Sequence, residues 1–129
     1  MQRIFMKHRN DCYTCCLAMI LGLQYEEVPR FIDDADNGIG EGFNKEVDKF
    51  LASRGMQCIS MNAPEGWMKE NIKGYCIVVT QSALAEYRDK GFVHSVIYKD
   101  GEFWHDPKQY SEIRMDPLYI DLIVPIIGD

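Results

Sequence analysis

The chain lacks a surplus of basic residues: 14 Lys and Arg stand against 20 Asp and Glu, giving a formal net charge of −6 at pH 7. Nucleic acids and anionic membranes attract proteins through basic surfaces, so we expect neither of these partners. Long apolar runs are lacking too, because the nine-residue run Cys15–Leu23 is far shorter than the ~20 residues that span a bilayer. No small-x-small cleavage site follows this run, so a signal peptide is not expected.

Disulfide pairing is also not indicated. The 129 residues contain five cysteines, an odd number, and three of them lie between positions 12 and 16. This pattern does not form a disulfide framework, and it favours a reducing, cytoplasmic location. With 47% apolar residues the chain can still bury one core. Its length predicts a single domain over residues 1–129.

Hydrophobic periodicity and turn residues predict an α+β fold, with N-terminal helices packed on one face of a mostly antiparallel sheet. The first helix is expected to be buried nearly all round and to stop at Gly22. The expected helices are Cys12–Leu23, Tyr25–Ile32 and Asn44–Arg54, with a loop over Asp33–Gly42 and a helical turn at Ala83–Arg88. The expected strands are Arg3–Met6, Met56–Met61, Tyr75–Thr80, Phe92–Lys99, Glu102–His105 and Asp121–Ile127.

Cys12 is the first candidate for chemistry, because Asn10 or Asp11 is expected to cap a helix that begins at this cysteine. The free N–H groups and the dipole at a helix start favour negative charge, which lowers the pKa of a thiol and increases its nucleophilic thiolate form. The alternative is that Cys12 is a small core residue, since free cysteine is among the most buried residue types. For Cys15 and Cys16, inside the apolar helix, the core interpretation is the stronger one.

His94 and Asp106 are the second candidate pair, on two strands joined by the hairpin signal Lys99–Gly101. A two-residue Asp-Gly turn would send the two side chains to opposite faces. A three-residue loop with a left-handed Gly101 would pair His94 with Asp106 on the same face. In that arrangement the carboxylate would orient the imidazole. The alternative is that Asp106 only begins an Asp-Pro turn and does not orient His94. His105, the competing base, faces away from Asp106 in either register.

A metal site is a weaker alternative. His8, Cys12, Cys15 and Cys16 form a group of potential ligands, but structural zinc sites usually combine two separated ligand pairs from loops. Here the second pair would have to come from the scattered Cys58 and Cys76. We therefore expect no metal and no cofactor.

Two stretches of the chain together resemble small papain-like cysteine peptidases, closest to the bacteriocin-leader-processing peptidases and their short phage and bacterial relatives. The first is Asp11–Gly22 (DCYTCCLAMILG) followed by Tyr25–Pro29 (YEEVP), and the second is His94–Tyr98 (HSVIY) with Asp106-Pro107 (DP). The resemblance implies a papain-like fold and cleavage of a peptide or amide bond through a Cys12 thioester. It makes Cys12 the nucleophile, His94 the base and Asp106 the orienting acid, with a peptide or protein as substrate. Deamidation or transfer to an amine would use the same residues.

Two departures from the family pattern concern the oxyanion hole and the residue after the nucleophile. The family's Gln, an oxyanion donor, is replaced by Met6, so His8 or Asn10 would have to supply that donor, with His8 expected to matter more. The family's small residue after the nucleophile is replaced by Tyr13. These two departures favour the alternative function, a non-catalytic papain-fold module that binds a protein and derives from a phage or plasmid.

Overall fold

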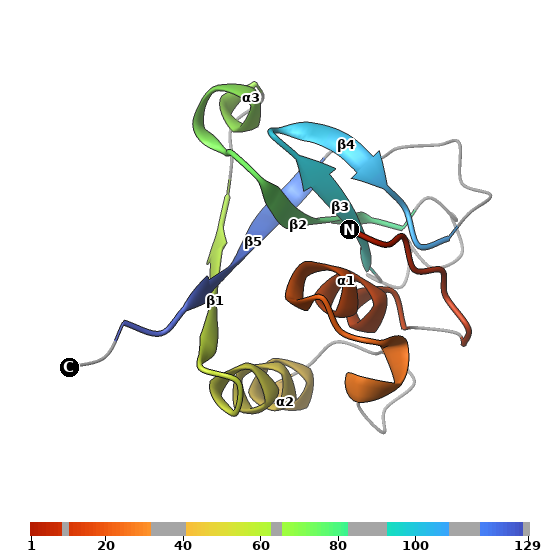
Figure 1. The fold of residues 1–129 in the computed structure, drawn as a ribbon. Coiled ribbons are helices and arrows are strands. Elements are labelled where there is room, and N and C mark those ends of the chain that lie inside the picture. The colour runs from red at the N-terminus through yellow and green to blue at the C-terminus, as the bar shows by residue number, and fades with distance from the viewer. Residues whose placement is uncertain (9–10, 32–40, 63–65, 83–92, 109–116, 128–129) are drawn as a thin grey trace.

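The computed structural model of the chain describes residues 1–8, 11–31, 41–62, 66–82, 93–108 and 117–127. These residues form a five-stranded sheet in which every neighbouring pair is antiparallel, with the order β1-β5-β2-β3-β4. With three α-helices packed on this sheet (Figure 1), the predicted α+β class is confirmed. The strands are β1 Met56–Met61, β2 Tyr75–Gln81, β3 Val93–Lys99, β4 Glu102–His105 and β5 Pro117–Pro125.

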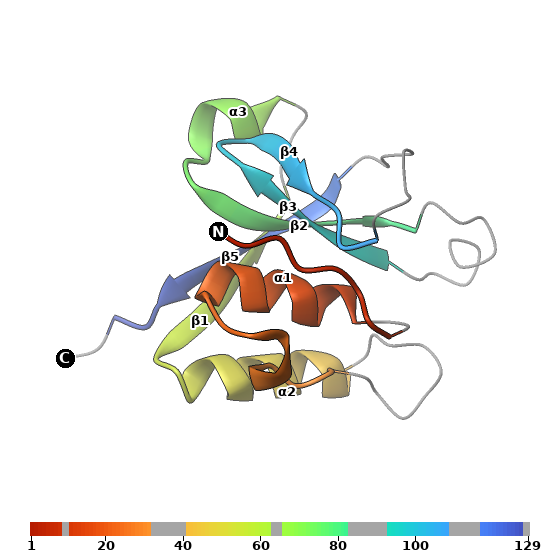
Figure 2. The ribbon, with the colours of Figure 1, turned by 45° about the vertical axis from the view of Figure 1, so that its right-hand side comes forward.

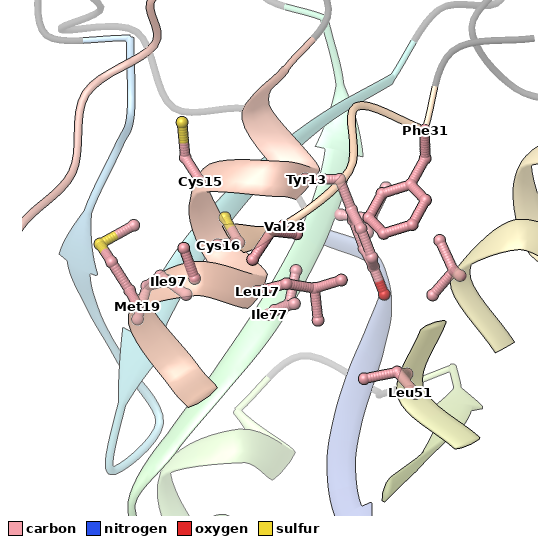
Figure 3. Close-up of a cluster of buried hydrophobic side chains, with 13 residues drawn as sticks. Tyr13, Cys15, Cys16, Leu17, Met19, Val28, Phe31, Leu51, Ile77 and Ile97 are labelled. Carbon is pink, nitrogen blue, oxygen red and sulfur yellow. The ribbon is translucent and has the colours of Figure 1, made fainter. Parts of the chain in front are cut away.

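Two helices cover one face of the sheet, where the larger core lies. α1 (Cys12–Leu21) lies against this face with α2 (Glu41–Ala52) beside it (Figure 2). The seven consecutive residues from Tyr13 to Met19 are all buried, which confirms the prediction that this helix is buried nearly all round. Ile77 and Ile97 of the sheet pack against it (Figure 3). The amino end of α1 is thereby held at a defined place against β3.

The opposite face of the sheet carries a smaller core and the short helix α3 (Trp67–Asn71). No helix is predicted in this part of the sequence, so α3 adds a helix on the second face to the N-terminal helices predicted on the first. Five residues are too few to show a helical period in the sequence. The hairpin turn between β3 and β4 packs against α3 so closely that a Cβ on Gly101 would lie 2.5 Å from the Lys69 backbone. Only glycine fits this position.

α1 ends two residues earlier than predicted, at Leu21, although the predicted stop at Gly22 is confirmed. Gly22 has a left-handed backbone (φ 68°), and the N–H groups of Gly22 and Leu23 donate to the carbonyls of Met19 and Ala18. This is the usual helix-ending hydrogen-bond pattern around a glycine. The predicted helix Tyr25–Ile32 is reduced to one 3-10 turn, η1 (Tyr25–Glu27). It stops because Val28 precedes Pro29 and is extended (φ −109°, ψ 126°).

The predicted strand Arg3–Met6 is wrong. This segment lies beside β4 but makes one backbone hydrogen bond there, from the Met6 N–H to the Pro107 carbonyl at 3.0 Å. The Ile4 carbonyl is instead 2.9 Å from Nε2 of His105, so a side chain takes the place of a strand partner. The segment therefore joins the end of β4 to the start of α1.

Other predicted boundaries shift by a few residues. β5 begins at Pro117 and ends at Pro125, and α2 begins at Glu41, inside the predicted loop Asp33–Gly42. Most of that loop and the predicted turn Ala83–Arg88 lie outside the described residues. In the described ranges no helix is long and apolar enough to cross a membrane.

Candidate active site

Cys12 is the first residue of α1, as predicted, and Asp11 stands at the N-cap position. The first N–H groups of any α-helix have no partner within the helix, so the Cys12 side chain starts from the positively polarised end of α1. Unlike Cys15 and Cys16, which are completely buried in the core, Cys12 keeps part of its surface exposed. The core interpretation thus holds for Cys15 and Cys16, whereas Cys12 is only partly buried.

His94 and Asp106 lie side by side. Nε2 of His94 is 2.6 Å from Oδ1 of Asp106, and both side chains are largely buried, with exposed fractions of 17% and 11%. The same carboxylate oxygen accepts a hydrogen bond from the Lys108 N–H at 2.8 Å. Asp106 therefore starts a turn and also holds the imidazole. Because Nε2 is directed at Asp106, Nδ1 is left for Cys12, whose thiol the imidazole also hydrogen-bonds.

The hairpin places His94 and Asp106 on the same face through a turn that differs from the predicted three-residue loop. The loop has two residues: Asp100 and Gly101 both have positive φ (52° and 81°), and Lys99 pairs with Glu102. A bulge then inserts Trp104, so that Ile97 pairs with His105 and the register changes by one. The predicted three-residue loop is wrong, but the prediction that His94 and Asp106 share a face is confirmed, because the bulge restores the alternation.

The tight turn is stabilised by its neighbours in the fold. The N–H of Asp100 donates to the Gly74 carbonyl at 2.8 Å, and Oδ1 of Asp100 accepts from the Gly74 N–H at 2.7 Å. An Asp-Gly pair with positive φ at both positions is the preferred two-residue hairpin turn. Its geometry suits the twist of the flanking strands, so the extra residue is accommodated in β4 rather than in the loop.

The electrostatics of Cys12 and His94 favour an ion pair. Burial acts to raise the pKa of the Cys12 thiol, but the hydrogen bond and charge of His94, together with Ser95, lower it below its ordinary value. Burial acts to lower the pKa of His94, but hydrogen bonds and charges from Asp106 and Cys12 raise it to about 10. Both shifts favour transfer of the thiol proton to the imidazole, which gives a thiolate next to an imidazolium, the nucleophilic form of a cysteine.

The pKa values of the other four cysteines are raised, in the opposite direction to that of Cys12. Burial raises the pKa of Cys15 to about 12, and that of Cys58 and Cys76 to about 11, with the negative charge of Asp121 acting in the same direction on the last two. Burial also raises the pKa of Cys16 well above its ordinary value. Among the five thiols, only Cys12 has a lowered pKa and a basic partner.

Ser95 is a member of the site that the sequence-based predictions missed. It follows His94 in β3 and is almost completely buried. Hydrogen bonding from its backbone N–H and its hydroxyl helps to lower the pKa of the Cys12 thiol. A serine in a strand gives no signal of this role, because which helix end lies against it is decided only by the packing of α1 on the sheet.

Replacing Ser95 by alanine is expected to raise the pKa of Cys12, because one of the hydrogen bonds to the thiolate is lost while the backbone N–H stays. We expect a shift of about one pH unit, in line with the ~1.5–3 kcal/mol typical of a hydrogen bond to a charged group. The pH dependence of the iodoacetamide reaction with Cys12 measures this shift. An unchanged profile in a folded Ser95→Ala protein would show that the hydroxyl does not bind the thiolate.

Tyr13, the residue after Cys12, points away from the site. Its ring is buried in the larger core (Figure 3), and its hydroxyl donates to Oδ2 of Asp121 in β5 at 2.8 Å. Ser60 in β1 donates to the other oxygen of the same carboxylate. Burial and the negative charge of Asp121 raise the pKa of the Tyr13 phenol well above its ordinary value. The bulk of Tyr13 therefore fills the core and does not obstruct the space next to Cys12.

The structure describes one of the two residues predicted to complete the oxyanion hole. The His8 side chain is exposed, and its backbone N–H donates to Oδ2 of Asp11 at 3.0 Å. Asn10 lies outside the described residues. Met6 is half-buried against the core. His105, the competing base, has Nε2 directed at the Ile4 carbonyl and is thus not available to Cys12.

No group of three or more His, Cys, Asp or Glu side chains that could hold a metal ion occurs within the described ranges. Comparisons with protein-family models, with curated proteins and with solved structures each gave no match.

Proposed function

We propose that the chain is a papain-like cysteine hydrolase or acyl transferase that acts on a peptide or amide bond. The observation that carries this proposal is a chain of contacts that joins three side chains from distant parts of the sequence. The Cys12 sulfur contacts the His94 imidazole, and the other ring nitrogen of His94 lies 2.6 Å from Asp106. A nucleophile within reach of a base that a third group orients is the arrangement expected for covalent catalysis of acyl transfer.

In the proposed reaction the resting proton of the pair is on His94. The Cys12 thiolate attacks the carbonyl carbon, a C–S bond forms, and the carbonyl oxygen becomes an oxyanion. When this intermediate collapses, the C–N bond breaks and His94 gives its proton to the leaving amine. Water then attacks the thioester while His94 takes a proton from it. The C–S bond breaks, the carboxylic acid leaves, and the thiolate-imidazolium pair is restored.

The position of Asp106 supports its role as the orienting acid. Its contact with Nε2 fixes the ring plane, so that the other nitrogen stays directed at Cys12. The Lys108 N–H bonds the same oxygen and fixes the carboxylate in turn. A carboxylate in this position stabilises the imidazolium without taking the proton itself.

The substrate is proposed to be a peptide or a protein. An amine in place of water would give transfer, and a side-chain amide as substrate would give deamidation, with the same three residues. All five cysteines are free thiols, which fits a reducing compartment such as the cytoplasm.

Cys12 is expected to react with iodoacetamide at pH 6 at least about 100-fold faster than Cys58. An ordinary thiol is less than about 1% thiolate at this pH, whereas the His94 imidazolium keeps Cys12 ionised. The thiolate is lost only as the pH falls through the lowered pKa of Cys12, so its rate should depend on pH less steeply between roughly pH 6 and pH 8 than that of an ordinary thiol. Labelling of the native protein, mapped by mass spectrometry over this range, gives both rates.

Cys58 is the matched control, because it is also partly exposed and its pKa is raised to about 11. Faster labelling of Cys58 would contradict the assignment of the nucleophile. A Cys12 rate that rises tenfold per pH unit up to pH 9, as for a free thiol, would favour the non-catalytic protein-binding module instead.

A further inference from the structure

Asp11, immediately before the nucleophile, is a completely buried carboxylate with an unusual set of partners. Its Oδ2 accepts hydrogen bonds from the backbone N–H of Lys7 at 3.1 Å and of His8 at 3.0 Å, and from the Tyr25 hydroxyl at 2.6 Å. Two of these donors precede Asp11 by three and four residues. The Asp11 carboxylate thus binds the backbone of Lys7 and His8 and also contacts η1 through Tyr25.

The Asp11 carboxylate does not form the hydrogen bond that is usual for an aspartate at the N-cap of a helix. An N-cap aspartate normally accepts hydrogen bonds from the N–H groups of the first helical turn. Asp11 occupies the N-cap position of α1, yet its side chain makes no such bond. It is turned towards the preceding segment, and the N–H groups at the start of α1 are left to the nucleophile and to an anion that forms beside it.

A second set of contacts holds the same segment against η1. The Lys7 ammonium lies 2.8 Å from a Glu26 carboxylate oxygen and 4.8 Å from the centre of the Tyr25 ring. The segment also leads back to β4 through the Met6 N–H and the Pro107 carbonyl, next to Asp106. Asp11 therefore lies where η1, the nucleophile helix and the residues that follow β4, among them Asp106, are joined.

We propose that Asp11 is a positioning residue for the oxyanion of acyl transfer. It fixes the backbone of Lys7 and His8 beside the amino end of α1 and keeps the first N–H groups of that helix free for the developing negative charge. This inference rests on the proposed function of Cys12. It assigns Asp11 no contact with substrate. The carboxylate acts on the transition state through the backbone that it holds.

Two probes of Cys12 separate this role from a general effect on the thiol. Iodoacetamide is attacked at a saturated carbon and forms no oxyanion. With p-nitrophenyl acetate, the thiolate attacks the carbonyl carbon and an oxyanion forms. The C–O bond then breaks, p-nitrophenolate departs, and Cys12 carries an acetyl thioester. The rates of labelling and of the first p-nitrophenolate turnover are measured on the full chain at pH 7, with circular dichroism as the test of folding.

Asp11→Ala is expected to reduce acylation by p-nitrophenyl acetate at least about 10-fold, since loss of one oxyanion donor costs on the order of 10²–10³ in rate. Its alkylation rate should stay within about twofold, because the Cys12 pKa is lowered by His94 and Ser95 rather than by Asp11. Asp11→Asn keeps an oxygen for the three donors and should restore most of the acylation rate. Glu102→Gln removes an exposed carboxylate that pairs with Lys69, and this control should change neither rate.

Tyr25→Phe removes one of the three donors and keeps the test decisive if Asp11→Ala does not fold. It should lower the acylation rate by a smaller factor and leave alkylation unchanged. A parallel fall of both rates, or no change in either, in a folded variant would overturn the positioning role of Asp11. If Cys12 of the unaltered protein reacts with neither probe, the proposed function itself is wrong.

Discussion

Replacing Cys12 by alanine is expected to abolish acyl transfer, and replacing His94 by alanine is expected to reduce it almost as far. Without the sulfur no thioester can form. Without the imidazolium the thiolate loses its counter-ion and the leaving amine loses its proton donor. Losses of about 10⁴-fold or more are usual for such groups. The first turnover of p-nitrophenyl acetate measures the acylation step without a known peptide substrate.

The double variant distinguishes a catalytic pair from two independent residues. Groups that act as a unit fail together, so Cys12→Ala with His94→Ala should be scarcely worse than either single change. Cys58→Ala is the matched control and should retain full activity. Thermal unfolding should show that each variant is folded. A folded His94→Ala protein with undiminished acylation would mean that another histidine is the base.

Replacing Asp106 by asparagine is expected to reduce acylation by about 10²–10⁴-fold, because the imidazole loses the carboxylate that orients it and stabilises its charge. Asp106 raises the pKa of His94, so its loss lowers that pKa from about 10. A weaker imidazolium also stabilises the thiolate less, which raises the pKa of Cys12. The pH range over which Cys12 is a thiolate next to an imidazolium should therefore narrow from both sides.

A pH profile of Cys12 alkylation between pH 4 and pH 10 measures this narrowing. Glu102→Gln is the control, since Glu102 is an exposed carboxylate of the same hairpin that pairs with Lys69 at 3.3 Å. It should leave the profile unchanged. A profile of Asp106→Asn that coincides with that of the unaltered protein would show that Asp106 only forms its turn.

Several elements could be predicted from the sequence because their signals are local. β1 and β4 have the predicted boundaries, since alternating side chains between turn residues indicate a strand without reference to the rest of the chain. Gly22 ends α1 because a left-handed residue stops any helix. Cys12 at the helix start is equally local, so a thiol in a favourable field could be expected at that position.

What the tertiary structure decided is how distant segments meet. The sequence does not show that the extra residue of the hairpin is a bulge at Trp104 in β4. A three-residue loop without a bulge would place His94 and Asp106 on the same face as well. The two-residue turn is distinguished from it only by the packing of the turn on Gly74 and α3. The direction of the Tyr13 side chain depends on Asp121, 108 residues away.

The contacts that Ser95 and Asp11 make at the site were also decided by the tertiary structure. The Ser95 hydroxyl reaches Cys12 because α1 crosses β3 at that point. The Asp11 carboxylate turns away from its own helix because the N–H groups of Lys7 and His8 and the Tyr25 hydroxyl offer it partners. The sequence by itself determined which groups could do chemistry, since reactivity follows from residue type and local backbone. The packing of helix on sheet determined which of them meet, because hydrogen bonds require approach to about 3 Å.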